Sequence, residues 1–132
     1  LDPIGRARAR EIAEVFNSGT QPLQNLSHMR EITARLGAPK DSDPGRELGK
    51  QAIETGLAAV EALVSKNRDE RYCVGSATSV ADLVLIPQLF NARRFSIDLA
   101  AFPRLLAVES HCMSLPHFVA SRPDAQPDAA KA

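Results

Sequence analysis

The stretch Ser79-Val80-Ala81-Asp82, followed by the run Leu-Val-Leu-Ile-Pro-Gln-Leu-Phe of residues 83–90, decides the fold of this 132-residue chain. Ser79 can cap the first turn of a helix, and Asp82 can accept the N–H of Ser79 in return, which is a capping box with Asp in the place of Glu. The run behind it is apolar nearly all round a helix. It therefore predicts a helix that is buried through the centre of the domain.

Further helix-opening signals lie on both sides of this run. Asp2-Pro3 and Asp43-Pro44 each combine a capping side chain with a proline at the first helical position. They predict helices over about residues 3–36 and 44–66, and two shorter helices follow the central one. Pro22 predicts a bend in the first helix, and Pro87 predicts a kink in the central one. With no strand pattern visible, we expect an all-α bundle of about five helices around a buried central helix.

The composition restricts the kinds of partner. Lys+Arg and Asp+Glu are 16 each, so the formal net charge is zero and gives no general attraction to nucleic acid or to an anionic membrane. No apolar run approaches the roughly 20 residues that span a bilayer. Cys73 and Cys112 are far apart and have no metal-ligand spacing, so we expect two partly buried free thiols in a reducing cytoplasm.

A polar stripe in the first predicted helix is a candidate binding site. It is formed by Gln21, Gln24, Asn25 and His28, whose i, i+3, i+4, i+7 spacing puts them on one face of a continuous helix. Amides donate and accept hydrogen bonds, which suits a ligand with peptide groups and carboxylates. On the residues alone, a solvated surface or amides that join two helices are more common explanations of such a stripe.

Arg93 and Arg94 form a second candidate site at the end of the central helix. A guanidinium that faces a cleft can hold a carboxylate through two parallel hydrogen bonds. A pair of surface cations that favours the helix dipole explains the same residues equally simply.

Several stretches, which together cover essentially the whole chain, resemble one family. They are Tyr72-Cys73-Val74-Gly75 before the capping box, Asp2-Pro3 with Arg6-Ala7 and Arg10, Gln21-Pro22-Leu23-Gln24-Asn25-Leu26-Ser27, Pro87-Gln88 with Asn91-Ala92-Arg93-Arg94-Phe95, His117-Phe118, and Arg122 to Asp128. The capping motif resembles that of glutathione transferase C-terminal domains. The glutamine-rich segment and the segment around Arg94 resemble the zeta class, the maleylacetoacetate isomerase type.

The resemblance implies a glutathione transferase C-terminal-like helical domain over residues 1–121 and a mobile tail over residues 122–132. It implies that the family's N-terminal thioredoxin-like domain, with its thiol-activating Ser-Ser-Cys run, is absent from this sequence. The function implied is glutathione-dependent cis–trans isomerisation of maleylacetoacetate or maleylpyruvate in aromatic amino-acid catabolism, by a cytoplasmic homodimer. This chain alone is therefore expected to be inactive.

The resemblance also implies the roles of individual residues. Those expected to contact glutathione are Gln21, Asn25, Leu26 and Ser27. Those expected to contact the dicarboxylate diketo-acid substrate are Arg94, Gln24 and His28. Ser79 and Asp82 are expected to cap the central helix, and no residue of this chain is expected to be catalytic or to bind a metal.

Two other functions remain open from the sequence. Helical domains of this type can also serve as stand-alone protein-interaction modules without catalysis, or as general dimerisation domains. The polar stripe and Arg94 favour the enzyme part, because an interaction module has no need of that arrangement.

Overall fold

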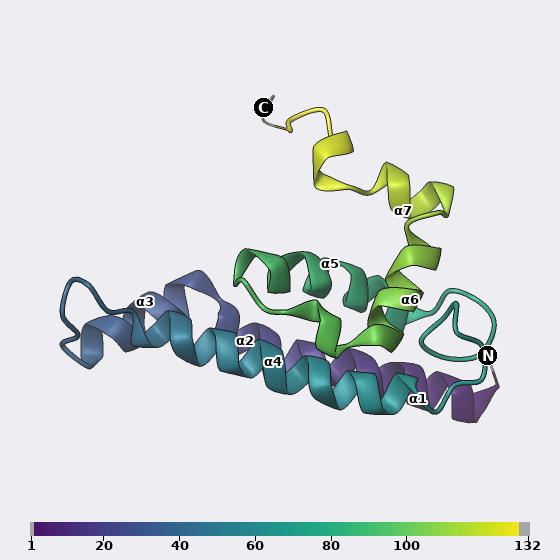
Figure 1. The fold of residues 1–132 in the computed structure, drawn as a ribbon, viewed down its shortest axis with the longest axis horizontal. Helices are drawn as coiled ribbons and strands as arrows, with labels where there is room; N and C mark the ends of the chain where they lie inside the picture. The colour runs from purple at the N-terminus through teal and green to yellow at the C-terminus, as the bar shows by residue number, and fades with distance from the viewer. Residues whose placement is uncertain (1, 130–132) are drawn as a thin grey trace.

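A computed structural model describes residues 2–129, and these form the predicted all-α bundle, with no strand in that range (Figure 1). The elements in chain order are α1 (Pro3–Glu14), the π-helix η1 (Val15–Thr20), α2 (Gln21–Gln24), α3 (Leu26–Arg35), α4 (Pro44–Val64), α5 (Val80–Arg94), the 3-10 helix η2 (Leu99–Ala101), α6 (Pro103–Cys112), α7 (Pro116–Ala120) and the 3-10 helix η3 (Pro123–Ala125). None of the helices described is long and apolar enough to cross a membrane.

Two long helical paths run side by side in opposite directions. The segment from α1 to α3 forms one path, and α4 returns alongside it and packs against η1, α2 and α3. Both paths begin with an aspartate cap: the side chain of Asp2 accepts the N–H of Gly5, and that of Asp43 accepts the N–H of Arg46. α5 packs on α1, and α6 packs on α4 and α5.

A single core joins these helices. Its largest fully buried apolar side chains come from η1, α4, α5 and α6, and they are Phe16, Ile53, Leu57, Leu85, Leu89 and Leu105. Burying each such side chain stabilises the fold by about 1.5–3 kcal/mol relative to leaving it in water. The core therefore depends on α5 lying in one fixed position between the other helices.

The start of α5 is held by one buried carboxylate. Asp82 is fully buried and accepts hydrogen bonds from the N–H of Ser79 (2.7 Å), the hydroxyl of Ser79 (2.8 Å) and the N–H of Cys73 (2.8 Å). The first of these belongs to the capping box, whose other half is the contact of the Ser79 side chain with the backbone N–H of Asp82. The third ties the buried Cys73-Val74 segment of the preceding loop to the helix, so one side chain positions both elements.

The first helical path differs from the expected single bent helix. It stays helical through Pro22, which lies in the first turn of α2, where its missing N–H leaves no bond unmade. The path widens into the π-helix η1 and breaks only at Asn25, whose backbone is extended (φ −66°, ψ 129°). The break falls there because the Asn25 side chain caps α3 in place of continuing the helix.

The expectation that α5 is buried on all sides is wrong for one face. Val80, Leu83 and Phe90 are 43%, 54% and 51% exposed, although the helix runs uninterrupted through Pro87. The opposite face carries the core residues. An apolar sequence all round a helix is thus explained here by a core on one side and an exposed apolar surface on the other.

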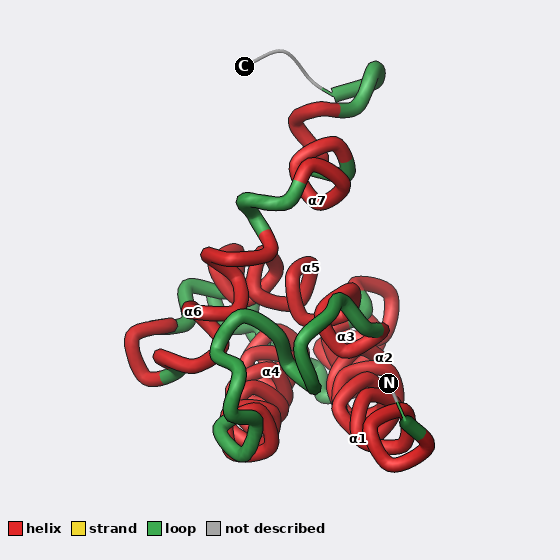
Figure 2. Tube along the Cα trace, turned by 90° about the vertical axis from the view of Figure 1, so that its right-hand side faces the viewer, coloured by secondary structure: helices red, strands yellow, loops and turns green. Residues whose placement is uncertain are grey.

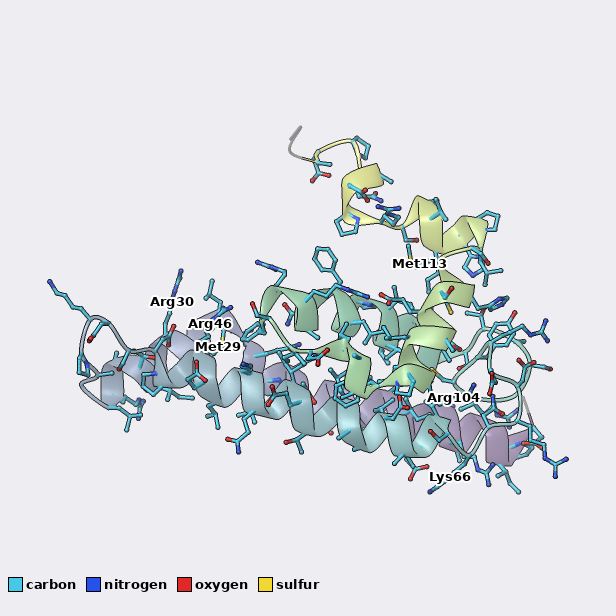
Figure 3. All side chains as sticks on the ribbon, in the orientation of Figure 1. Met29, Arg30, Arg46, Lys66, Arg104 and Met113 are labelled. Atoms are coloured by element: carbon cyan, nitrogen blue, oxygen red, sulfur yellow. The ribbon has the colours of Figure 1, made fainter. Side chains whose placement is uncertain are left out.

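Two glycines let α3 approach α4 closely. A Cβ on Gly45 would overlap the backbone carbonyl of Met29, and one on Gly49 would lie 2.8 Å from the Met29 sulfur. Met29 and Arg46 lie together at this end of the bundle, at the opposite end from Arg104 (Figure 3). This contact fixes α3 against α4.

α7 and the segment after it extend away from the bundle (Figure 2). Phe118 of α7 is nevertheless buried, and the Gln126 amide donates to the carbonyl oxygens of Ala120 and Arg122. Residues 130–132 of the expected mobile tail, together with Leu1, lie outside the described residues.

The Asp82 contacts give a stability prediction. In Asp82→Ala, the N–H groups of Ser79 and Cys73 lose their acceptor inside the protein, so we expect the free energy of unfolding to fall by about 3 kcal/mol or more. Urea unfolding followed by circular dichroism measures this. Asp98→Ala is the control, because Asp98 is an exposed cap that accepts only the N–H of Ala100, and about 1 kcal/mol is expected. Equal losses in the two variants would contradict the role of Asp82.

Candidate functional site

The junction between α2 and α3 presents a short exposed segment. The Asn25 side-chain oxygen accepts hydrogen bonds from the N–H (3.0 Å) and the hydroxyl (2.6 Å) of Ser27. Asn25 is thereby the N-cap of α3, which begins at Leu26. Leu26 is 56% exposed, and Asn25 and Ser27 are exposed on either side of it. The first N–H groups of a helix and the positive end of its dipole suit a carboxylate or another anionic group.

The polar stripe predicted on one helix face does not form. Gln21 and Gln24 belong to α2, Asn25 is the extended residue between the helices, and His28 lies in the first turn of α3. The prediction is wrong because the spacing argument assumes one continuous helix. Gln21 is half-buried, whereas Asn25 and His28 are exposed.

Gln24 turns toward α5. Its side-chain oxygen accepts hydrogen bonds from the amides of Gln88 (2.9 Å) and Asn91 (2.8 Å), and its own amide donates to the Gln88 oxygen (3.0 Å). Gln88 is only 2% exposed. Gln24 thus makes the contact between two helices that the sequence offered as an alternative explanation of the stripe, and one of its N–H groups is left for any ligand.

The two arginines at the end of α5 differ in their surroundings. Arg93 forms a bidentate ion pair with Glu109 of α6 (2.7 and 2.6 Å), and this pairing raises the pKa of its guanidinium. Arg94 is exposed, and within the described part of the chain its side chain has no hydrogen-bond or ion-pair partner. Of the two, Arg94 is the one whose guanidinium is available to a ligand.

The end of α5 is fastened by a residue that the sequence argument missed. Arg46 of α4 donates to the backbone carbonyl of Arg94 (2.9 Å) and lies over the ring of Phe95, 4.5 Å from its centroid. Gln88 and Asn91 were missed as well. Gln88 carried a signal, because an amide within an apolar run has to find a buried partner.

The structure brings the two candidate sites onto adjoining elements. α2 and α5 are joined through Gln24, and Arg94 follows Asn91 by three residues, so it is the next neighbour along that helix. A hollow of about 750 Å³ lies elsewhere, beside the first turns of α4, and Asn25 and Arg94 do not line it. The described part of the structure thus joins α2 to α5 through Gln24, but it shows no hollow that Asn25 and Arg94 line together.

The three histidines occupy separate places. His28 is exposed on α3, His111 of α6 packs edge-on against Tyr72 (4.9 Å between ring centroids), and His117 of α7 lies beside Phe118. His111 and His117 therefore belong to packing contacts at the far end of the chain.

Known proteins resemble this chain over nearly its whole length. The "Probable maleylacetoacetate isomerase 2" of Drosophila melanogaster is 42% identical over 123 residues, which are 93% of this chain and 50% of the fly protein. A crystal structure of maleylacetoacetate isomerase from Anaeromyxobacter dehalogenans 2CP-1 with bound GSH in the active site matches with a TM-score of 0.89 and 42% identity, over 98% of this chain and 57% of the other.

A third relative is the holo structure of maleylpyruvate isomerase, described as a bacterial glutathione S-transferase in the zeta class. It matches with a TM-score of 0.88 and 32% identity, over 98% of this chain and 61% of the other. The chain spans about half the length of the curated relatives it matches.

The family "Glutathione S-transferase, C-terminal domain" matches residues 27–116, which include α4, the capping box and all of α5. The chain therefore belongs to the glutathione S-transferase family, and it matches that family's C-terminal domain.

Proposed function

We propose that this chain is the substrate-side, helical part of a glutathione-dependent cis–trans isomerase that acts on maleylacetoacetate or maleylpyruvate. The observation that carries the proposal is the likeness, at 32–42% identity, to proteins named for these two activities, over at least 92% of this chain. Two free, buried cysteines accord with a reducing compartment such as the cytoplasm. A homodimer is part of the proposal and rests on the family resemblance alone.

The segment Asn25 to Ser27 fits the peptide part of glutathione. It combines an exposed amide, the exposed Leu26 and the N-terminal end of α3, and the half-buried Gln21 lies one turn before Asn25. These groups can donate to a carboxylate and accept from a peptide N–H. When bound, glutathione would supply a thiol whose addition turns the substrate's double bond into a single bond that can rotate, and whose departure restores the double bond.

The task of this chain's residues would be to hold the substrate still during that chemistry. Arg94 would bind one carboxylate of the diacid through two hydrogen bonds, and the exposed His28 would contact the same substrate. The Phe90 ring, four residues before Arg94 on α5, would give the carbon chain of the substrate an apolar surface.

A further domain would complete the site. Val80, Leu83 and Phe90 expose an apolar face of α5, and a soluble protein of this size does not usually leave a contiguous apolar helix face in water. The curated relatives are about twice as long as this chain. We infer that a thioredoxin-like domain packs on this face and activates the thiol.

The proposal predicts where activity resides. The complete gene product with its N-terminal domain should isomerise a maleyl diketo-acid in a glutathione-dependent reaction, measured by the loss of substrate absorbance. Residues 1–132 alone should show no turnover, because they supply binding groups but no activated thiol. Turnover by residues 1–132 that matches the complete protein, or no glutathione-dependent turnover by the complete protein, would contradict this.

The two arginines offer a matched pair of variants. Arg94→Ala in the complete protein should lower kcat/KM for the diacid at least about ten-fold, because it removes a charge-assisted bidentate contact. Arg93→Ala removes the pairing with Glu109 on α6 and should lower Tm while kcat/KM changes less than about two-fold. Steady-state kinetics and thermal unfolding of both variants measure this. The role of Arg94 fails if the two variants lose activity equally.

The two cysteines should not act as thiols in the reaction. Burial, with the Asp82 carboxylate nearby, raises the pKa of the Cys112 thiol to about 12 and also raises the pKa of Cys73 strongly. A raised pKa keeps a thiol protonated, so at pH 8 fewer than about one in a thousand Cys112 side chains is the reactive thiolate. Native protein should react slowly with a thiol reagent at pH 8, and protein unfolded in urea should react at once. Rapid reaction of either cysteine in the folded chain would contradict this.

A further inference from the structure

The amides of Gln24, Gln88 and Asn91 form a closed cluster, which we name the amide cluster. Gln24 and Gln88 exchange two hydrogen bonds of 2.9 and 3.0 Å, and Asn91 donates a third to the Gln24 oxygen at 2.8 Å. The Gln24 oxygen has two lone pairs, and both are occupied. The three hydrogen bonds therefore tie the end of the Gln24 side chain to two residues of α5 at once.

Burial makes this arrangement hard to break. Gln88 is 2% exposed, and a buried amide without a partner costs about as much as a lost hydrogen bond and its desolvation together. Gln24 is therefore the obligatory partner of Gln88. Because Gln24 is the last residue of α2, this contact fixes the point at which α2 ends and the exposed segment begins.

The other side of the same turn is held by α4. A Cβ on Gly49 would lie 3.3 Å from the carbonyl oxygen of Leu23 and 3.5 Å from the Cα of Gln24, so the backbone here rests directly on that glycine. The turn is thus fixed between α4 on one side and the amide cluster of α5 on the other. Asn25, the next residue, has its position set by both contacts.

We propose that the amide cluster is a positioning device, which sets the distance between the glutathione-binding segment at Asn25 and the carboxylate-binding Arg94. This inference rests on the proposed function. Gln88 contacts neither ligand in this scheme, and Gln24 affects glutathione binding through the position of Asn25. Asn91, three residues before Arg94, connects the cluster to the other half of the site.

The test uses the complete protein and glutathione alone, with Kd measured by isothermal titration calorimetry. Gln88→Met keeps the length of the side chain and removes the amide, and Asn91→Ala removes only the third hydrogen bond from a half-buried position. We expect Kd to rise about five-fold or more in Gln88→Met and less in Asn91→Ala, since one net hydrogen bond corresponds to about five-fold. Gln51→Met, at an exposed glutamine of α4, is the matched control and should change Kd less than two-fold.

A double-mutant cycle separates positioning from a loss of stability. In the Asn25→Ala background, Gln88→Met should have little further effect on Kd, because both substitutions act through the same contact. If the two substitutions raise the Kd for glutathione independently, so that their fold-changes multiply, the inference is overturned. It is also overturned if Gln88→Met lowers Tm but binds glutathione like the unaltered protein. If Gln88→Met does not fold, the same cycle is run with Asn91→Ala, and an unchanged Kd there overturns the inference.

The outcomes distinguish this inference from the proposed function. An unaltered complete protein that binds no glutathione overturns both. An unaltered protein that binds glutathione and is weakened by Asn25→Ala, but not by Gln88→Met or Asn91→Ala, overturns the positioning role alone.

Discussion

The buried carboxylate of Asp82 is the contact on which the rest of the domain depends. It joins a loop to the first turn of α5, and the direction of α5 then determines what its later residues reach. Asn67 holds the backbone of this loop in place, because its amide donates to the carbonyl oxygens of Asp69, Tyr72 and Gly75. A shift at this end would move Gln88, and with it the far end of the helix.

The interior of α5 shows a balance between stability and specificity. Leucine or methionine at position 88 would bury apolar area without any need for a partner, whereas a glutamine there requires one amide in one place. Apolar contacts with α2 would tolerate sliding or rotation, but three hydrogen bonds between amides do not. The polar contact thus gives precision to the helix pair, although it adds little to the free energy of folding.

Much of the architecture was readable from local signals. The two Asp-Pro openings and the capping box act over a few residues, so a single sequence reveals them. The break at Asn25 was not predicted, because helical spacing and an asparagine cap compete over the same residues and only tertiary contacts decide between them. For the same reason, the local sequence pattern does not predict the pairing of Gln24 with Gln88, which lies 64 positions away.

The packing of α1 on α5 has a consequence for how the chain is made. About 65 residues separate the end of α1 from the start of α5, so the first helices leave the ribosome well before their partner exists. During that interval the apolar side of Ala9, Ile12 and Phe16 has no cover from α5. A nascent chain at this stage is a natural client for chaperones, and synthesis that stops before Ser79 yields a product that cannot complete its own core.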